Sequence, residues 1–184
     1  MEFLFETDKA IFFFFNHTLS CGALDRFFTI LTDVNSWFIT YILLVGILLT
    51  YGGKRGRIAV VMVILLVFVC DQFGARFLKE WVARPRPFDF LTDVYLPAGK
   101  AGAYSFPSNH ALNNFAVAVF FSILYPKFKW ILYTVAALIA LSRLYVGVHY
   151  PSDVLAGALI GSAIGYGFAR LQILFERKQG FLPA

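Results

Sequence analysis

Chemically capable side chains gather in three short stretches of an otherwise apolar chain. They supply three basic groups, two imidazoles, a hydroxyl and a carboxylate, in chain order Lys79, Arg86, Ser108, His110, Arg143, His149 and Asp153. Fixed cations can neutralise phosphate oxygens, and an imidazole or a hydroxyl can act as a nucleophile. The set therefore predicts transfer of a phosphoryl group from a phosphate ester without a metal ion.

The spacing of these residues resembles the pattern of a known family. Along the chain it is Lys-x6-Arg-Pro, then Pro-Ser-x-His, then Ser-Arg-x5-His-x3-Asp. This order and spacing resemble the type-2 phosphatidic acid phosphatases, which share their core with the vanadium haloperoxidases. The compact length and short loops look like the bacterial lipid A 1-phosphatase branch. Asn109 stands where the family usually has Gly, and because Asn tolerates unusual backbone dihedral angles, we expect the turn to survive.

The resemblance implies a role for each residue. His149 would be the nucleophile that forms a phosphohistidine, Asp153 would hold the other ring nitrogen, and His110 would protonate the leaving oxygen. The substrate phosphate would be bound by Lys79, Arg86, Ser108, Asn109 and Arg143. No cofactor and no metal ion are implied, because the basic side chains would do the work of Mg²⁺.

Local signals place the hydroxyl and one imidazole at the start of a helix. Pro107 and Ser108 precede an apolar run, and serine is favoured as an N-cap residue. The free backbone N–H groups at such a helix start bind anions, so a phosphate oxygen could lie there beside His110. The alternative is that Ser108 is only a cap and His110 an interfacial histidine.

A second helix start is predicted near His149. Pro151 argues against one continuous helix through His149 and Asp153, so one helix should end at Gly147 and the next begin at Pro151. Asp153 would then lie in a first turn, where a carboxylate could also merely complement the helix dipole. Small residues follow it at intervals of four and predict a face for close helix packing, namely Gly157, Gly161 and Gly165.

Polar residues outside this set receive no catalytic role. Arg84 could reach lipid headgroups at the membrane surface, as basic residues near the ends of membrane helices often do. Asp71 and Gln72 could form a structural polar pair. Asn113 and Asn114 are more typical of hydrogen bonds between helices than of catalysis.

Composition predicts an integral membrane protein. Of 184 residues, 59% are hydrophobic, which is more apolar surface than one small soluble core could bury. We expect an all-α transmembrane helix bundle that forms a single domain over residues 1–184. Five segments are long enough to span the membrane: 23–51, 57–82, 108–125, 129–147 and 151–175. Residues 3–20 form a further apolar segment that could either span the membrane or lie in its interface.

Basic residues in short loops predict the orientation. They cluster in the loop 52–57, in the loop 126–129 and in the tail after residue 175. By the positive-inside rule these loops are cytoplasmic, so the three chemical stretches emerge on the opposite face. In a bacterium this is the periplasmic face of the inner membrane.

Several other classes are disfavoured. The net charge of +5 is scattered over loops and helix ends, which excludes a nucleic-acid surface, and two cysteines form neither a disulfide framework nor a metal site. A transporter would need charges through the depth of the bundle, whereas here they gather at one end. A haloperoxidase would hold vanadate in a similar cage, but those relatives are soluble.

The position of the site limits the range of candidate substrates. A site at the membrane edge, in a chain without a separate soluble domain, indicates a lipid whose phosphate is reached from the bilayer. Lipid A 1-phosphate is the first expectation, while undecaprenyl diphosphate, phosphatidylglycerol phosphate and phosphatidate remain alternatives. The sequence leaves the oligomeric state open.

Overall fold

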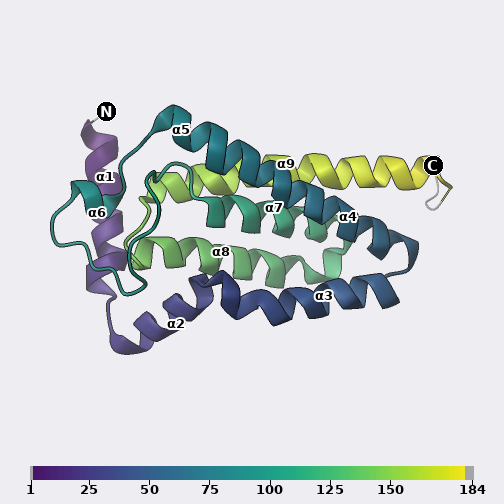
Figure 1. Cartoon of the computed structure of the whole chain (residues 1–184), viewed down its shortest axis with the longest axis horizontal. Helices are drawn as coiled ribbons and strands as arrows, with labels where there is room; N and C mark the ends of the chain where they lie inside the picture. The colour runs from purple at the N-terminus through teal and green to yellow at the C-terminus, as the bar shows by residue number, and fades with distance from the viewer. Residues whose placement is uncertain (1, 181–184) are drawn as a thin grey trace.

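Long apolar helices run side by side along the molecule (Figure 1). In chain order they are α3 (Phe38–Tyr51), α4 (Gly53–Cys70), α7 (Asn109–Leu124), α8 (Lys129–Tyr145) and α9 (Pro151–Lys178). The computed structural model describes residues 2–180, and within this range it contains no β-strand. The predicted all-α transmembrane bundle is therefore confirmed.

Four helical stretches are long and apolar enough to cross a membrane: Val34–Tyr51, Gly53–Val82, Pro126–Tyr145 and Pro151–Lys178. The second of these continues α4 through a π-helical turn, η3 (Asp71–Leu78), into α5 (Lys79–Val82), and the third begins with the turn η4 (Pro126–Phe128). The shorter apolar helix α7 contacts α4, α8 and α9. The chain is thus a multi-pass, membrane-embedded protein.

The first predicted span, residues 23–51, is interrupted. Helix α2 (Gly22–Thr32) ends before Asp33, whose backbone is extended with φ −78° and ψ 115°. The Asp33 carboxylate accepts a hydrogen bond from the backbone N–H of Asn35 and caps the 3₁₀ turn η2 (Val34–Trp37) that precedes α3. Because a side-chain cap replaces the hydrogen bonds of a continuous helix, the chain bends at Asp33.

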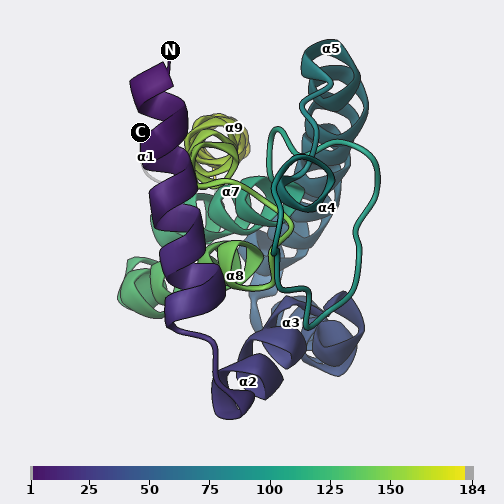
Figure 2. The same ribbon diagram turned by 90° about the vertical axis from the view of Figure 1, so that its left-hand side faces the viewer.

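The N-terminal segment lies across the end of the bundle. Helix α1 (Glu2–Phe13) and the π-helical turn η1 (Phe14–Thr18) run crosswise to the long helices in Figure 1, and Figure 2 shows α1 in front of the helix ends. Its exposed apolar side chains include Phe3, Leu4 and Phe14. Since spanning helices define the membrane normal, this orientation favours the interfacial alternative for residues 3–20.

The centre of the bundle is the contact between α7 and α9. A Cβ atom added at Gly157, Gly161 or Gly165 would lie only 2.1 to 2.5 Å from a backbone carbonyl oxygen of α7 or of Ser108, the residue that caps it. The two backbones can approach this closely only because these positions lack side chains. The predicted packing face of small residues is confirmed.

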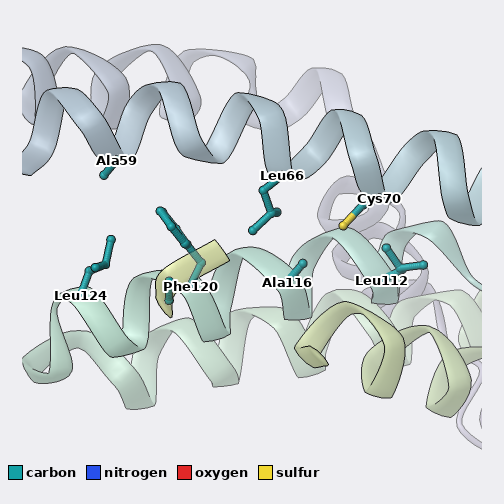
Figure 3. Close-up of a cluster of buried hydrophobic side chains, with 8 residues drawn as sticks. Ala59, Leu66, Cys70, Leu112, Ala116, Phe120 and Leu124 are labelled. Carbon is teal, nitrogen blue, oxygen red and sulfur yellow. The ribbon is translucent and has the colours of Figure 1, made fainter. Parts of the chain in front are cut away.

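Helix α4 packs on the other side of α7. Figure 3 shows Leu66 and Cys70 of α4 facing Leu112, Ala116 and Phe120 of α7, and all five side chains are fully buried. These apolar contacts hold α4, which leads toward Lys79, against α7, which begins after Ser108.

Replacing Gly161 with alanine should destabilise the fold by about 1–3 kcal/mol or more, because the new Cβ would collide with the Leu112 carbonyl oxygen at 2.1 Å. Gly167 on the same helix is the matched control, since a Cβ there has no neighbour within 4 Å. Thermal unfolding in detergent should show a lower midpoint for Gly161→Ala and no loss for Gly167→Ala. Equal midpoints would contradict the packing.

Candidate active site

The predicted residues meet at one end of the bundle. Lys79 begins α5, Arg86 precedes the short helix α6 (Pro87–Phe90), and Arg143 lies in the last turn of α8. The N-cap of α7 is Ser108, and Asp153 lies in the first turn of α9. The basic loops occupy the other end, where Arg55 of α4 faces Glu176 of α9 at 3.5 Å. The candidate site residues and the basic loops thus lie at opposite ends of the bundle.

The first helix start forms as predicted. Ser108 has extended backbone angles, is fully buried, and its Oγ accepts from the backbone N–H of Ala111 at 3.5 Å. The Ser108 N–H donates to the backbone carbonyl of Asp153 at 3.0 Å. This bond joins the start of α7 directly to the start of α9.

The second helix start also forms as predicted. Gly147 follows α8 with a positive φ of 79°, and an added Cβ there would lie 2.4 Å from the Tyr95 carbonyl oxygen. The chain then passes His149, and Pro151 begins α9. The Asp153 carboxylate accepts a hydrogen bond from the backbone N–H of Tyr150 at 2.9 Å, which fixes the carboxylate next to the turn that contains His149.

His149 and Asp153 form a buried pair. The imidazole Nδ1 lies 3.5 Å from Asp153 Oδ2 and makes no hydrogen bond within residues 2–180, while the side chains are 3% and 0% exposed. The opposite ring nitrogen, Nε2, lies 3.3 Å from Nη1 of Arg86. Because a guanidinium can only donate, Nε2 is the acceptor in this contact, so the ring proton lies on the Nδ1 side that faces Asp153. Nε2 then carries the lone pair that can attack phosphorus.

Backbone carbonyl groups hold two of the cations in place. Lys79 Nζ donates to the carbonyl oxygens of Tyr104 at 2.9 Å and Pro107 at 3.0 Å. The Arg86 guanidinium donates to the carbonyl oxygens of Val148 at 2.7 Å and Gly102. Because carbonyl groups carry no net charge, they position these cations without neutralising them.

Arg143 has an unused donor. Its side chain is buried and its Nη1 donates to Thr32 Oγ1, but its Nε is buried with no hydrogen-bond partner among residues 2–180. A buried N–H group of this kind is costly unless an acceptor arrives. An anionic oxygen would satisfy it through a strong, charge-assisted hydrogen bond.

The surroundings of His149 keep it neutral. Burial holds its pKa well below the ordinary value of 6.5, and the positive charges of Arg143, Arg86 and Lys79 lower it further. The imidazole is therefore unprotonated at neutral pH, as a nucleophile must be.

His110 and Asn109 lie in the first turn of α7 but face different neighbours. His110 Nε2 lies 3.2 Å from the Thr32 carbonyl oxygen, so the same threonine contacts both His110 and Arg143. Asn109 Oδ1 is buried with no hydrogen-bond partner in the described part of the chain, and a Cβ added at Gly74 would lie 3.3 Å from it. The Asn109 side chain thus fits because Gly74, next to it, has no side chain.

Sequence reasoning missed Arg84 and Thr32. Arg84 does not extend to lipid headgroups but donates to Asp153 Oδ1 at 2.6 Å and to Asp8 Oδ2 at 2.8 Å. A signal was present, since Arg84 lies two residues before Arg86 in an Arg-Pro-Arg-Pro run. Nothing in the sequence distinguishes Thr32, because its contacts form only when α2 packs on α8.

The remaining polar residues have structural partners. Asn113 Nδ2 donates to Asp71 Oδ1 at 2.9 Å, which joins α7 to η3, whereas Asn114 bonds to the His110 carbonyl of its own helix. Over residues 2–180, no group of three or more His, Cys, Asp or Glu is arranged to hold a metal ion. The site as described presents cations and imidazoles to a ligand.

A helical membrane bundle with an imidazole–carboxylate pair and three cations at one end is typical of a membrane-embedded phosphatase. Residues 55–176 match the family model of the PAP2 superfamily. The chain belongs to this superfamily and is a phosphoric monoester hydrolase.

Two curated relatives match along most of the chain. A lipid A 4'-phosphatase of Porphyromonas gingivalis is 30% identical over 97% of this chain and 78% of its own length. A lipid A 4'-phosphatase of Bacteroides thetaiotaomicron is 34% identical over 91% of this chain and 78% of its own length. Among solved structures, Aquifex aeolicus LpxE superposes with a TM-score of 0.68 and 28% identity, covering 88% of this chain and 93% of that chain.

The pKa of His149 can be measured directly. In protein labelled with ¹⁵N-histidine, the His149 imidazole should remain neutral as the pH falls below 6.5, because burial lowers its pKa. The signal can be assigned by its loss in His149→Asn. Since the unfolded chain takes up this proton near pH 6.5 and the folded chain does not, the stability due to neutral His149 should decline below that pH. A midpoint at or above 6.5 would contradict this environment.

Proposed function

We propose that this protein is a lipid phosphatase that removes a phosphate from lipid A through a phosphohistidine intermediate, at the periplasmic face of the bacterial inner membrane. The observation that carries the proposal is the buried His149, with Nδ1 at Asp153 and Nε2 beside Arg86. Such a pair has a clear role in covalent catalysis, because the carboxylate fixes the tautomer and leaves Nε2 available.

The first step forms the intermediate. His149 Nε2 attacks phosphorus, the ester P–O bond breaks, and His110 donates a proton to the leaving oxygen. Lys79, Arg86 and Arg143, with Ser108 and the N–H groups at the start of α7, stabilise the three equatorial oxygens. The unpartnered Nε of Arg143 supports this role.

The second step returns the enzyme to its starting state. Water attacks phosphorus and gives a proton to His110, the P–N bond breaks, and inorganic phosphate leaves with His149 neutral again. Throughout, Asp153 offsets the positive charge that the imidazole carries while phosphorus is attached.

The relatives favour a saccharolipid substrate. The two lipid A phosphatases match this chain over nearly its full length, so the likeness includes the segments outside the catalytic core. Both relatives are lipid A 4'-phosphatases, whereas the compact length and short loops of this chain resemble the lipid A 1-phosphatase branch. We therefore place the 4'-phosphate first and the 1-phosphate second.

Purified protein should release phosphate from lipid A, and more slowly from undecaprenyl diphosphate, phosphatidylglycerol phosphate and phosphatidate. Lipid A that carries only the 4'-phosphate or only the 1-phosphate assigns the position. A preference of about tenfold or more in kcat/KM for one of the other lipids, roughly 1.4 kcal/mol of transition-state binding, would overturn lipid A as the substrate.

His149→Ala should abolish phosphate release, because the imidazole forms the covalent bond. The exposed His17 provides a control, since His17→Ala removes an imidazole outside the site. A purified, folded His149→Ala protein that kept more than about a hundredth of the wild-type kcat, a loss under roughly 2.7 kcal/mol, would exclude covalent catalysis by this residue.

The orientation can be tested with a natural probe. Cys21 is exposed and lies at the catalytic end, where its backbone N–H contacts Tyr145 Oη, whereas Cys70 is buried. In intact cells a membrane-impermeant maleimide should label Cys21. In a Cys21→Ser background, Lys127→Cys should be labelled only after lysis, because the basic loops are cytoplasmic. The reverse pattern would place the site in the cytoplasm.

A further inference from the structure

The side chains that hold Asp153 come from outside the predicted catalytic set. Arg84 Nη1 donates to Asp153 Oδ1 at 2.6 Å, and its Nη2 donates to Asp8 Oδ2 at 2.8 Å. Asp8 belongs to the interfacial helix α1, so a single guanidinium joins that helix to the carboxylate beside His149.

Asp8 is held in this place by several contacts. Its carboxylate accepts the backbone N–H of Ser152 at 2.8 Å and also bonds to Ser152 Oγ. Phe5 and Phe12, on the same face of α1 as Asp8, pack on the ring of Tyr150 with centroid distances of 6.1 and 6.0 Å. Asp8 is therefore a buried anion on the face of α1 that covers the start of α9.

Arg84 is equally constrained. Its guanidinium carbon lies 4.0 Å from the centre of the Tyr150 ring, and Nη1 also donates to Ser152 Oγ at 2.7 Å. Although burial opposes it, the carboxylates of Asp153 and Asp8 raise the pKa of Arg84 above its ordinary value. Arg84 thus stays charged between two carboxylates.

The charge balance of this trio matters to His149. With all three groups ionised, Asp8, Arg84 and Asp153 together carry one net negative charge. Without Asp8, Arg84 would neutralise Asp153 and the trio would carry none. The complete trio therefore opposes the positive charge that His149 acquires when its Nε2 bonds to phosphorus more strongly than Arg84 and Asp153 alone would.

We propose that Asp8 and Arg84 are positioning residues, through which helix α1 sets the orientation and net charge of the Asp153 carboxylate that serves His149. The inference rests on the proposed role of His149 as nucleophile. In this role neither residue contacts the substrate. Arg84 orients the Asp153 carboxylate, and Asp8 balances the positive charge of Arg84, so that the negative charge of Asp153 is not cancelled.

The test compares two variants of α1 that lose the same charge. Asp8→Asn removes the buried carboxylate with little change in shape, whereas Glu6→Gln removes a carboxylate whose side chain is 60% exposed and pairs with Lys9. Asp8→Asn should lower kcat for lipid A about tenfold with KM almost unchanged, because the loss falls on charge that develops only during the reaction. Glu6→Gln should match wild type.

A second measurement does not need activity. In ¹⁵N-histidine spectra at neutral pH, the His149 signals should move in Asp8→Asn and not in Glu6→Gln, while those of His17 report the fold. Ser152→Ala keeps every charge and removes only the Oγ bonds to Asp8 and Arg84, so it should lower kcat by about two- to threefold.

The outcomes separate the two proposals. If wild type releases phosphate, but Asp8→Asn matches Glu6→Gln in kcat and in the His149 signals, the positioning role is refuted. If Asp8→Asn does not fold, Ser152→Ala decides in its place, and unchanged kcat with unchanged His149 signals refutes the role. If wild type releases no phosphate from any lipid tested, the proposed function fails, and the His149 signals still decide whether Asp8 acts on the pair.

Discussion

The close approach of α7 and α9 is the constraint on which the rest of the structure depends. Gly157, Gly161 and Gly165 let the two backbones touch, and the Ser108 N–H then donates to the Asp153 carbonyl at the ends of both helices. Because this contact fixes one helix start against the other, the free N–H groups at the start of α7 lie near the carboxylate that pairs with His149. In the proposed mechanism, any loosening of the glycine face would move the phosphate-binding groups away from His149.

Charge is neutralised unevenly among the candidate site residues. Neutral carbonyl groups hold Lys79 and Arg86, so their charge remains available to a phosphate, whereas Arg84 is taken up by two carboxylates. The site thus contains cations that differ in role although they are close in sequence. His149 stands between them, with one nitrogen toward the cationic side and the other toward Asp153.

Much of the fold was predictable from local signals. Apolar segments of sufficient length predicted the spanning helices, Pro107 and Ser108 predicted the start of α7, and Gly147 and Pro151 predicted the break around His149. These signals act within a few residues, so they can be recognised in the sequence without the tertiary structure. The bend at Asp33 was missed because its cap consists of hydrogen bonds that Asp33 accepts from the backbone N–H of Asn35 and the hydroxyl of Ser36, inside an otherwise apolar run.

The sequence by itself determined which groups exist to do chemistry and at which end of the bundle they emerge, because residue types, apolar lengths and basic loops are written along the chain. Tertiary structure decided their partners. The sequence left open whether residues 3–20 span the membrane or lie in its interface. In the structure α1 packs on Tyr150, and this packing brings Asp8 to Arg84, 76 residues away. Contacts of this kind depend on the relative positions of whole helices, which no local pattern specifies.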